Sequence, residues 1–165
     1  MDATTEALLK TLEAQRAHVI GCLEGLDPAG LRTATLPTGW TALGMVQHLT
    51  LDVERFWFER VMAGDEREER DADADAAESS WDVDADRSPE AVVGDYRSAI
   101  ERSNAVIERT PLEAPPSYWP DYFGQWRLAD LRAVMLHVIA ETACHAGHLD
   151  ASRELIDGGT WLILE

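Results

Sequence analysis

Apolar residues recur at helical spacing along four long segments of this 165-residue chain, and no other feature limits the fold as strongly. Steps of three, four and seven residues place side chains on one face of an α-helix, whereas a strand shows strict alternation. The pattern predicts helices over residues 5–26, 41–63, 88–109 and 128–157. Helices with one apolar face bury that face against one another. We therefore expect an all-α fold, a four-helix bundle that forms a single domain over residues 1–165.

Capping residues support these boundaries. Ser88 followed by Pro89 is a strong helix start, because serine caps the free backbone N–H groups and proline fits the first helical position. Gly64 and Gly158 stand where the second and fourth helices should stop. Asp27, which a proline follows, predicts a short helical turn between the first two helices.

Two long loops separate the predicted helices. The first, residues 65–87, is strongly acidic: between Asp65 and Glu90 there are twelve acidic and three basic residues, in a chain of net charge −17. Alternating like charges leave no apolar face, so we expect a solvated connection whose far end Trp81 fixes to the helices. The second, residues 110–125, is rich in proline and aromatic residues. So acidic a surface repels phosphate backbones, which argues against nucleic-acid binding.

Three features predict a cytoplasmic location. No apolar run reaches the roughly 18 residues that a membrane span needs. The N-terminus is acidic and polar, unlike a secretory signal. The two cysteines, Cys22 and Cys144, are too few for a disulfide framework and fit a reducing compartment. We therefore expect neither membrane nor nucleic acid among the partners.

The last predicted helix carries polar residues on its apolar face. Steps of four and three residues connect Val134, Val138, Glu141, His145, His148, Ser152 and Leu155. Such steps predict the inward face of a bundle helix, and a buried ionised carboxylate requires a compensating partner. Glu141 and His145 lie one turn apart, a spacing at which both side chains can bind one metal ion.

His48 is the candidate for a third ligand. It lies in the second predicted helix, beside the apolar residues Met45 and Leu49. Two histidines and one carboxylate, with a coordination position left open, form a common catalytic site for a divalent metal. Two alternatives remain open at this point: His48 could be a hydrogen-bonded core residue, and Glu141 could simply form a hydrogen bond with His145.

The remaining histidines and the second cysteine have less specific expected roles. His137 lies on the flank of the last helix, where a structural or ligand-supporting role is expected. His148 could be a fourth ligand, a base or a hydrogen-bond donor in the core. We expect His18 on the surface of the first helix, and Cys144 as a small buried residue that points away from the candidate site.

Two regions of the chain resemble the DinB-like superfamily, and in particular an uncharacterised bacterial branch of it. Residues 136–148 (LHVIAETACHAGH), continuing to residues 153–158 (RELIDG), resemble the last helix of that superfamily. Residues 36–49 (LPTGWTALGMVQHL) and 54–58 (ERFWF) resemble the same branch. The resemblance spans nearly the whole chain, and its motifs are short individually but specific as a set.

The resemblance implies a four-helix bundle that holds one divalent metal ion, commonly Zn²⁺ or Ni²⁺. One histidine comes from the second helix and two ligands come from the last, which in this chain are His48, Glu141 and His145. Many members have histidine where Glu141 stands, and glutamate there is similar to mycothiol-dependent maleylpyruvate isomerase. The resemblance, together with the apolar tail at residues 161–164, also makes a homodimer plausible.

The implied activities are thiol-dependent: S-transfer of, or isomerisation through, a low-molecular-weight thiol such as mycothiol or bacillithiol, with a small-molecule substrate. A thiol bound in the open metal position loses its proton and becomes a nucleophile. His148, His137 or Asp52 could relay protons. The aromatic residues that could line a substrate pocket are Trp40, Trp57, Trp119 and Tyr122. The alternatives are a metal-dependent hydrolase and a non-catalytic bundle that binds a small molecule or partner around a structural metal.

Overall fold

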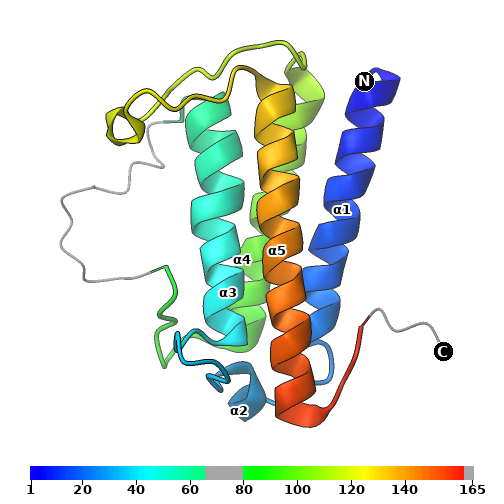
Figure 1. Cartoon of the computed structure of the whole chain (residues 1–165), viewed down its shortest axis with the longest axis vertical. Coiled ribbons are helices and arrows are strands. Elements are labelled where there is room, and N and C mark those ends of the chain that lie inside the picture. Colours follow the sequence, from blue (N-terminus) through cyan, green and yellow to red (C-terminus); the bar gives the residue numbers. More distant parts are fainter. Residues whose placement is uncertain (66–79, 162–165) are drawn as a thin grey trace.

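The computed structural model describes residues 1–65 and 80–161, and its regular structure in these ranges is entirely helical (Figure 1). The elements are α1 (Ala3–Leu23), α2 (Pro28–Leu31), α3 (Ala42–His48), η1 (Leu49–Met62), α4 (Pro89–Arg109), η3 (Asp121–Phe123) and α5 (Leu131–Asp157). The predicted all-α fold is therefore confirmed. The predicted solvated connection falls largely on residues 66–79 and most of the apolar tail on residues 162–165, which lie outside the described residues.

The long helices pack side by side as a bundle (Figure 1). Helix α5 lies against α1 on one side and against α3 and η1 on the other, and α4 packs on α3 and η1. The core between them is made of fully buried apolar side chains from every long helix, among them Leu12, Val19, Leu43, Leu49, Phe58, Tyr96, Ile107, Val134 and Val138. No helix in the described ranges combines the length and the apolar character that a bilayer crossing requires.

Local sequence explains where the helices begin and end. The side chains of Asp2, Thr41, Ser88 and Asp130 each accept a hydrogen bond from a backbone N–H in the first turn of α1, α3, α4 and α5. Such a cap is worth about 1 kcal/mol of stability. Gly158 ends α5 in the left-handed conformation (φ 73°), which glycine adopts without steric cost. The predicted boundaries agree with these ends to within a few residues.

The second long helix changes type in the middle. Helix α3 passes directly into η1, a π-helix that begins at Leu49, immediately after His48. Single π-turns inside α-helices are frequent at functional sites, and here the wider turn continues for 14 residues. The spacing of apolar residues predicted the helix but not this change.

A buried ion pair ties α1 to η1. Arg16 and Glu54 are 1% and 0% exposed. The Nε and Nη2 groups of Arg16 donate to the two carboxylate oxygens of Glu54 at 2.7 and 2.5 Å. Its Nη1 group donates to Glu13 and Asn104, both at 2.8 Å. Because each charge is satisfied by the others, this network fixes how the two helices pack, and removing one member leaves an uncompensated buried charge.

The inward face of α5 differs from the predicted one. The buried residues of this helix are Leu131, Val134, Met135, Val138, Thr142, Ala146, Leu149 and Ser152. His148 is exposed and Leu155 is 64% exposed, so placing them on the inward stripe was wrong. Cys144 is also exposed rather than buried. The physical reason is that this helix is rich in small residues, so apolar spacing does not distinguish two neighbouring faces that lie about 100° apart.

Candidate metal centre

The structure brings His48, Glu141 and His145 together. His48 is the last residue of α3, and the other two lie one turn apart in α5, which packs against α3. One ligand atom from each residue lies within 4.8 Å of the other two. The ring centroids of His48 and His145 are 5.0 Å apart, with the rings edge to face. Two helices therefore place two imidazoles and one carboxylate around a common point.

Asp52 and Trp81 hold the His48 ring in place. Nδ1 of His48 lies 3.0 Å from Oδ2 of Asp52, one helical turn further along the chain. When Nδ1 donates its hydrogen to this carboxylate, the lone pair on Nε2 is available to a cation, which is the arrangement found around histidine ligands in metal sites. The indole of Trp81 stacks on the same ring, with centroids 4.0 Å apart and planes 13° from parallel.

His145 is held as a neutral imidazole. Burial, together with the nearby His48, lowers the pKa of His145 to about 4, although Glu141 opposes the shift. Its Nε2 atom lies 3.6 Å from Oε2 of Glu141, and its buried Nδ1 atom has no hydrogen-bond partner among the described residues. A neutral ring with an unsatisfied buried nitrogen is the form that binds a metal ion.

Glu141 lies at the edge of the core rather than inside it. Its side chain is 39% exposed, so the expectation of a buried carboxylate was wrong. The exposure arises because the buried position is the next residue, Thr142, which lies about 100° around the helix from Glu141. Its Oε1 atom lies 3.8 Å from Nε2 of His137, and its Oε2 atom faces His145. A half-exposed carboxylate beside two imidazoles gives the cluster one negative charge and leaves one side open to solvent.

The donor set fits a divalent transition metal. Two imidazole nitrogens and one carboxylate oxygen suit Zn²⁺ and similar ions, and hard ions such as Ca²⁺ prefer oxygen ligands throughout. The orphaned Nδ1 of His145 and the carboxylate-supported ring of His48 are both observations that a bound cation would explain. The residues present therefore fit a single metal ion.

The segment after residue 80 contributes more to this centre than its sequence suggested. The side-chain amide of Gln47 donates to the backbone oxygens of Ser80 and Asp82 at 3.3 and 2.9 Å. A Cβ atom on Gly44 would lie only 2.2 Å from the backbone oxygen of Trp81, so this close approach requires glycine. Trp81 was expected to anchor the acidic loop, but its contact with His48 was not predicted. The only signal in the sequence for this contact was a large apolar side chain, Trp81, in an otherwise polar segment.

The other predicted site residues fall into two groups around the three ligands. His137 packs against Trp57, with ring centroids 4.7 Å apart, inside a cluster that also contains Trp119, Phe123 and Trp126. Tyr122 contacts this cluster through Phe123 but is 68% exposed. His148 lies apart from it, with its ring 6.0 Å from that of Trp40 and 5.8 Å from that of His145. Of the four predicted pocket residues, Trp57, Trp119 and Tyr122 therefore lie in or next to the aromatic cluster, whereas Trp40 lies beside His148.

The chain matches one protein family over most of its length. A family model described as mycothiol-S-transferase matches residues 7–158, a range that includes His48, Glu141 and His145. No curated protein and no solved structure matches the chain. The match agrees with the resemblance that the last helix and the region around His48 show to DinB-like proteins. The chain therefore belongs to the mycothiol-S-transferase family of the DinB-like superfamily.

Proposed function

We propose that this protein transfers a low-molecular-weight thiol, mycothiol or a close analogue, to an electrophilic small molecule with the help of one divalent cation. In this proposal His48, Glu141 and His145 hold the cation, which is Zn²⁺ or Ni²⁺. The observation that carries the proposal is the convergence of three ligand atoms to within 4.8 Å in a chain of a thiol-transferase family.

The residues around the three ligands prepare the site for this chemistry. A divalent cation supplies Lewis acidity, which lowers the pKa of a nearby thiol and gives a nucleophile near neutral pH. Asp52 accepts the Nδ1 hydrogen of His48 and so fixes the tautomer that leaves Nε2 free. The low pKa of His145 keeps its ring neutral, so protons compete weakly for this ligand above about pH 4.

His137 is the best-placed acceptor for the proton of the thiol. Its Nε2 atom lies 3.8 Å from Oε1 of Glu141. Burial lowers the pKa of His137, so the ring is neutral near pH 7 and can accept a proton. In the proposed reaction the thiol S–H bond breaks and its proton passes to His137. The sulfur then forms a bond to the electrophilic carbon, and the leaving group departs with its electron pair.

The aromatic cluster beside His137 is the proposed binding surface for the organic part of the acceptor. Trp57 stacks with Phe123 at a centroid distance of 5.9 Å, and Trp119 and Trp126 contact both. Trp126 is 44% exposed, so the cluster reaches the surface. An apolar electrophile bound there would lie next to His137, the proposed proton acceptor, whose ring in turn lies beside the carboxylate of Glu141.

Metal content and thiol consumption together test this function. The metal-loaded protein is incubated with a small thiol and a panel of electrophiles, and consumption of the thiol is followed with and without a chelator. Glu141→Gln and His145→Ala should each contain one metal ion fewer per chain than the wild type and should lose activity. Glu154→Gln, an exposed glutamate of the same helix, is the matched control and should change neither quantity.

Two outcomes would contradict the proposal. The first is unchanged metal content in Glu141→Gln. The second is the absence of metal-dependent conjugation across a broad panel of electrophiles. Turnover of esters or amides without added thiol would instead identify a hydrolase.

A further inference from the structure

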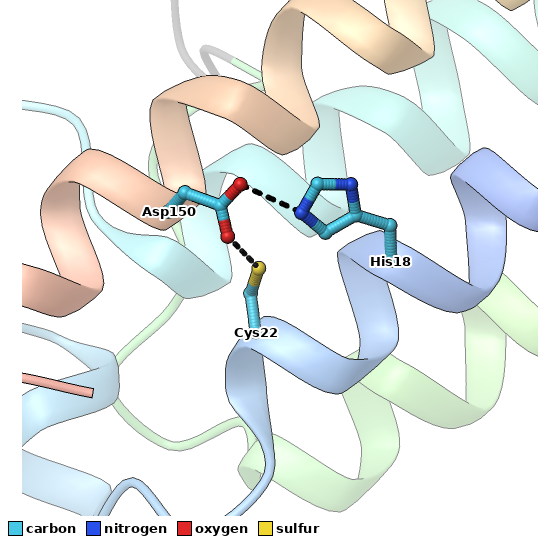
Figure 2. A group of neighbouring side chains, drawn as sticks. All are labelled: His18, Cys22 and Asp150. Carbon is cyan, nitrogen blue, oxygen red and sulfur yellow. Dashed lines mark hydrogen bonds and ion pairs between the residues drawn. The ribbon is translucent and has the colours of Figure 1, made fainter. Parts of the chain in front are cut away.

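A second group of potential metal ligands lies between α1 and α5, and it shares no residue with the candidate metal centre (Figure 2). His18 and Cys22 lie one turn apart in α1, and both side chains point toward Asp150 of α5. One ligand atom from each of the three lies within 4.8 Å of the other two. His18 is 8% exposed and Cys22 is 3% exposed. The expectation that His18 lies on the surface was therefore wrong, because its ring packs against α5.

The carboxylate of Asp150 lies between the other two groups. Its Oδ2 atom is 2.7 Å from Nε2 of His18, and its Oδ1 atom accepts a hydrogen bond from Sγ of Cys22 at 3.2 Å. A ring nitrogen of His18 and the sulfur of Cys22 thus each face one oxygen of the same carboxylate, as Figure 2 shows. The three side chains form a compact donor set of one nitrogen, one sulfur and one carboxylate.

This order of groups excludes a nucleophilic cysteine. In a catalytic cysteine site the imidazole lies between thiol and carboxylate, so that it can remove the proton of the thiol. Here the carboxylate occupies the middle position. Burial and the contact with Asp150 also raise the pKa of Cys22 to about 12, so the thiol is protonated and unreactive near neutral pH.

The same three groups suit a metal ion of borderline softness. Thiolate sulfur, imidazole nitrogen and carboxylate oxygen are all ligands of Zn²⁺, whereas Mg²⁺ and Ca²⁺ avoid sulfur. Ligand atoms around a tetrahedral zinc ion lie roughly 3.4–3.8 Å from each other. The present contacts of 2.7 and 3.2 Å would need to open by less than about 1 Å to reach this spacing.

The surroundings of the cluster hold its parts in place. The indole of Trp161 stacks on the ring of His18, with centroids 5.9 Å apart and planes 17° from parallel. Trp161 also covers Gly21, where a Cβ atom would lie 2.1 Å from the indole. On the other side, Nη1 of Arg153 donates to the backbone oxygen of Cys22 at 2.8 Å. The donor set is therefore ordered before any ligand binds, which lowers the entropy that binding costs.

We propose that His18, Cys22 and Asp150 bind a second divalent cation, Zn²⁺ or a similar ion, that clamps the end of α1 to α5. Binding breaks the S–H bond of Cys22 and forms a sulfur–metal bond, and the released proton passes to solvent. The N–H hydrogen of neutral His18 moves from Nε2 to Nδ1, so one proton leaves per ion bound. No oxidant or other reactant is required, and the proposal does not depend on the function proposed for the first centre.

Cobalt(II) titration distinguishes this site from the first one. Co²⁺ binds zinc sites and gives a near-ultraviolet charge-transfer band only when a thiolate is among its ligands. The full-length, metal-free protein is kept reduced with a phosphine, without any added thiol, and Co²⁺ is added in steps. The expected result is a charge-transfer band that stops growing by about two ions per chain, because the first centre also takes up Co²⁺ but contains no sulfur ligand.

Variants assign that band to its ligands. Cys22→Ser should abolish it, and Asp150→Asn should weaken Co²⁺ binding at least tenfold. Cys144→Ser, which removes the other and exposed cysteine, is the matched control and should leave the band unchanged. Glu141→Gln should also leave it unchanged, whatever happens at the first centre. Circular dichroism and thermal unfolding of the metal-free variants show whether each one is folded.

Two results would overturn the second site. One is the absence of a charge-transfer band in the folded wild type at millimolar Co²⁺, which would leave the cluster as a purely hydrogen-bonded contact between helices. The other is a band that disappears in Cys144→Ser and persists in Cys22→Ser.

Discussion

Replacing Asp52 by asparagine should weaken metal binding at the first centre about tenfold without unfolding the protein. The side chain keeps its shape, but it loses the negative charge that accepts the Nδ1 hydrogen of His48 at 3.0 Å. A carboxylate that supports a histidine ligand is typically worth 10- to 100-fold in affinity, about 1.4–2.7 kcal/mol. Asp52 is 36% exposed, so water screens part of this interaction and the lower value applies.

The effect can be measured in two independent ways. In a Cys22→Ala background, where the second site cannot bind, calorimetric titration with Zn²⁺ should give a dissociation constant about ten times that of the same background with Asp52 intact. At a metal concentration that saturates both proteins, Tm should fall by about 3–6 °C, because about 1.4 kcal/mol of binding energy no longer stabilises the fold.

Asp157→Asn is a close control for this substitution. Asp157 also accepts hydrogen bonds from a residue one turn away in its helix, and it is 38% exposed, but it is not near the three ligands. Its loss should leave the affinity unchanged. An affinity of Asp52→Asn within threefold of the background, or an equal loss in Asp157→Asn, would refute the argument that Asp52 orients His48.

Three further outcomes follow from the structure. Arg16→Met or Glu54→Leu alone should lower the free energy of unfolding by about 3–5 kcal/mol in urea titrations, because each leaves a buried charge without its main partner, while the double variant should recover most of the loss. The free energy of unfolding of the metal-free protein should fall by up to about 3 kcal/mol as pH falls from about 6.5 to 4, because the pKa of His145 is lowered in the fold and the unfolded chain binds that proton first. His145→Gln should remove this part of the pH dependence of stability. Gly44→Ala should cost about 1–3 kcal/mol in thermal unfolding and weaken metal binding, because its Cβ would lie 2.2 Å from the backbone oxygen of Trp81.

Two of these have a matched control elsewhere in the chain, and the pH dependence is compared with and without His145. Glu113→Gln breaks an exposed ion pair with Arg132 and should cost less than about 1 kcal/mol. A Cβ on helical Gly94 meets nothing within 4 Å, so Gly94→Ala should be neutral or stabilise by up to about 1 kcal/mol. Equal costs at Gly44 and Gly94, or a pH profile that is the same with and without His145, would contradict the corresponding reasoning.

The sequence predicted most of the architecture, because the strongest signals are local. Helical spacing and capping residues depend on neighbours within one or two turns, so the boundaries around Ser88 and Gly158 could be read directly. The side chains of His48, Glu141 and His145 lie together as the sequence analysis expected. That they hold a metal ion stays a prediction.

Tertiary packing determines the features that could not be predicted. Along α5, Glu141 and His145 lie beside buried Thr142 and Ala146, and only the positions of α1 and α3 decide which of the two faces turns inward. The burial of His18 is also decided by a partner 132 residues away, Asp150, which no local pattern indicates. For the same reason the contact of Trp81 with His48 joins two segments that local reasoning treats separately.

The π-helical form of η1 has a consequence for how this protein can vary. Its last six residues, Trp57 to Met62, are all buried, whereas a regular α-helix at the edge of a bundle would turn some of them to solvent. Apolar residues within η1 can therefore be exchanged for others of similar size, but shortening the segment by one residue would rotate every later side chain away from its neighbours. Insertions and deletions, more than substitutions, should be excluded between residues 49 and 62.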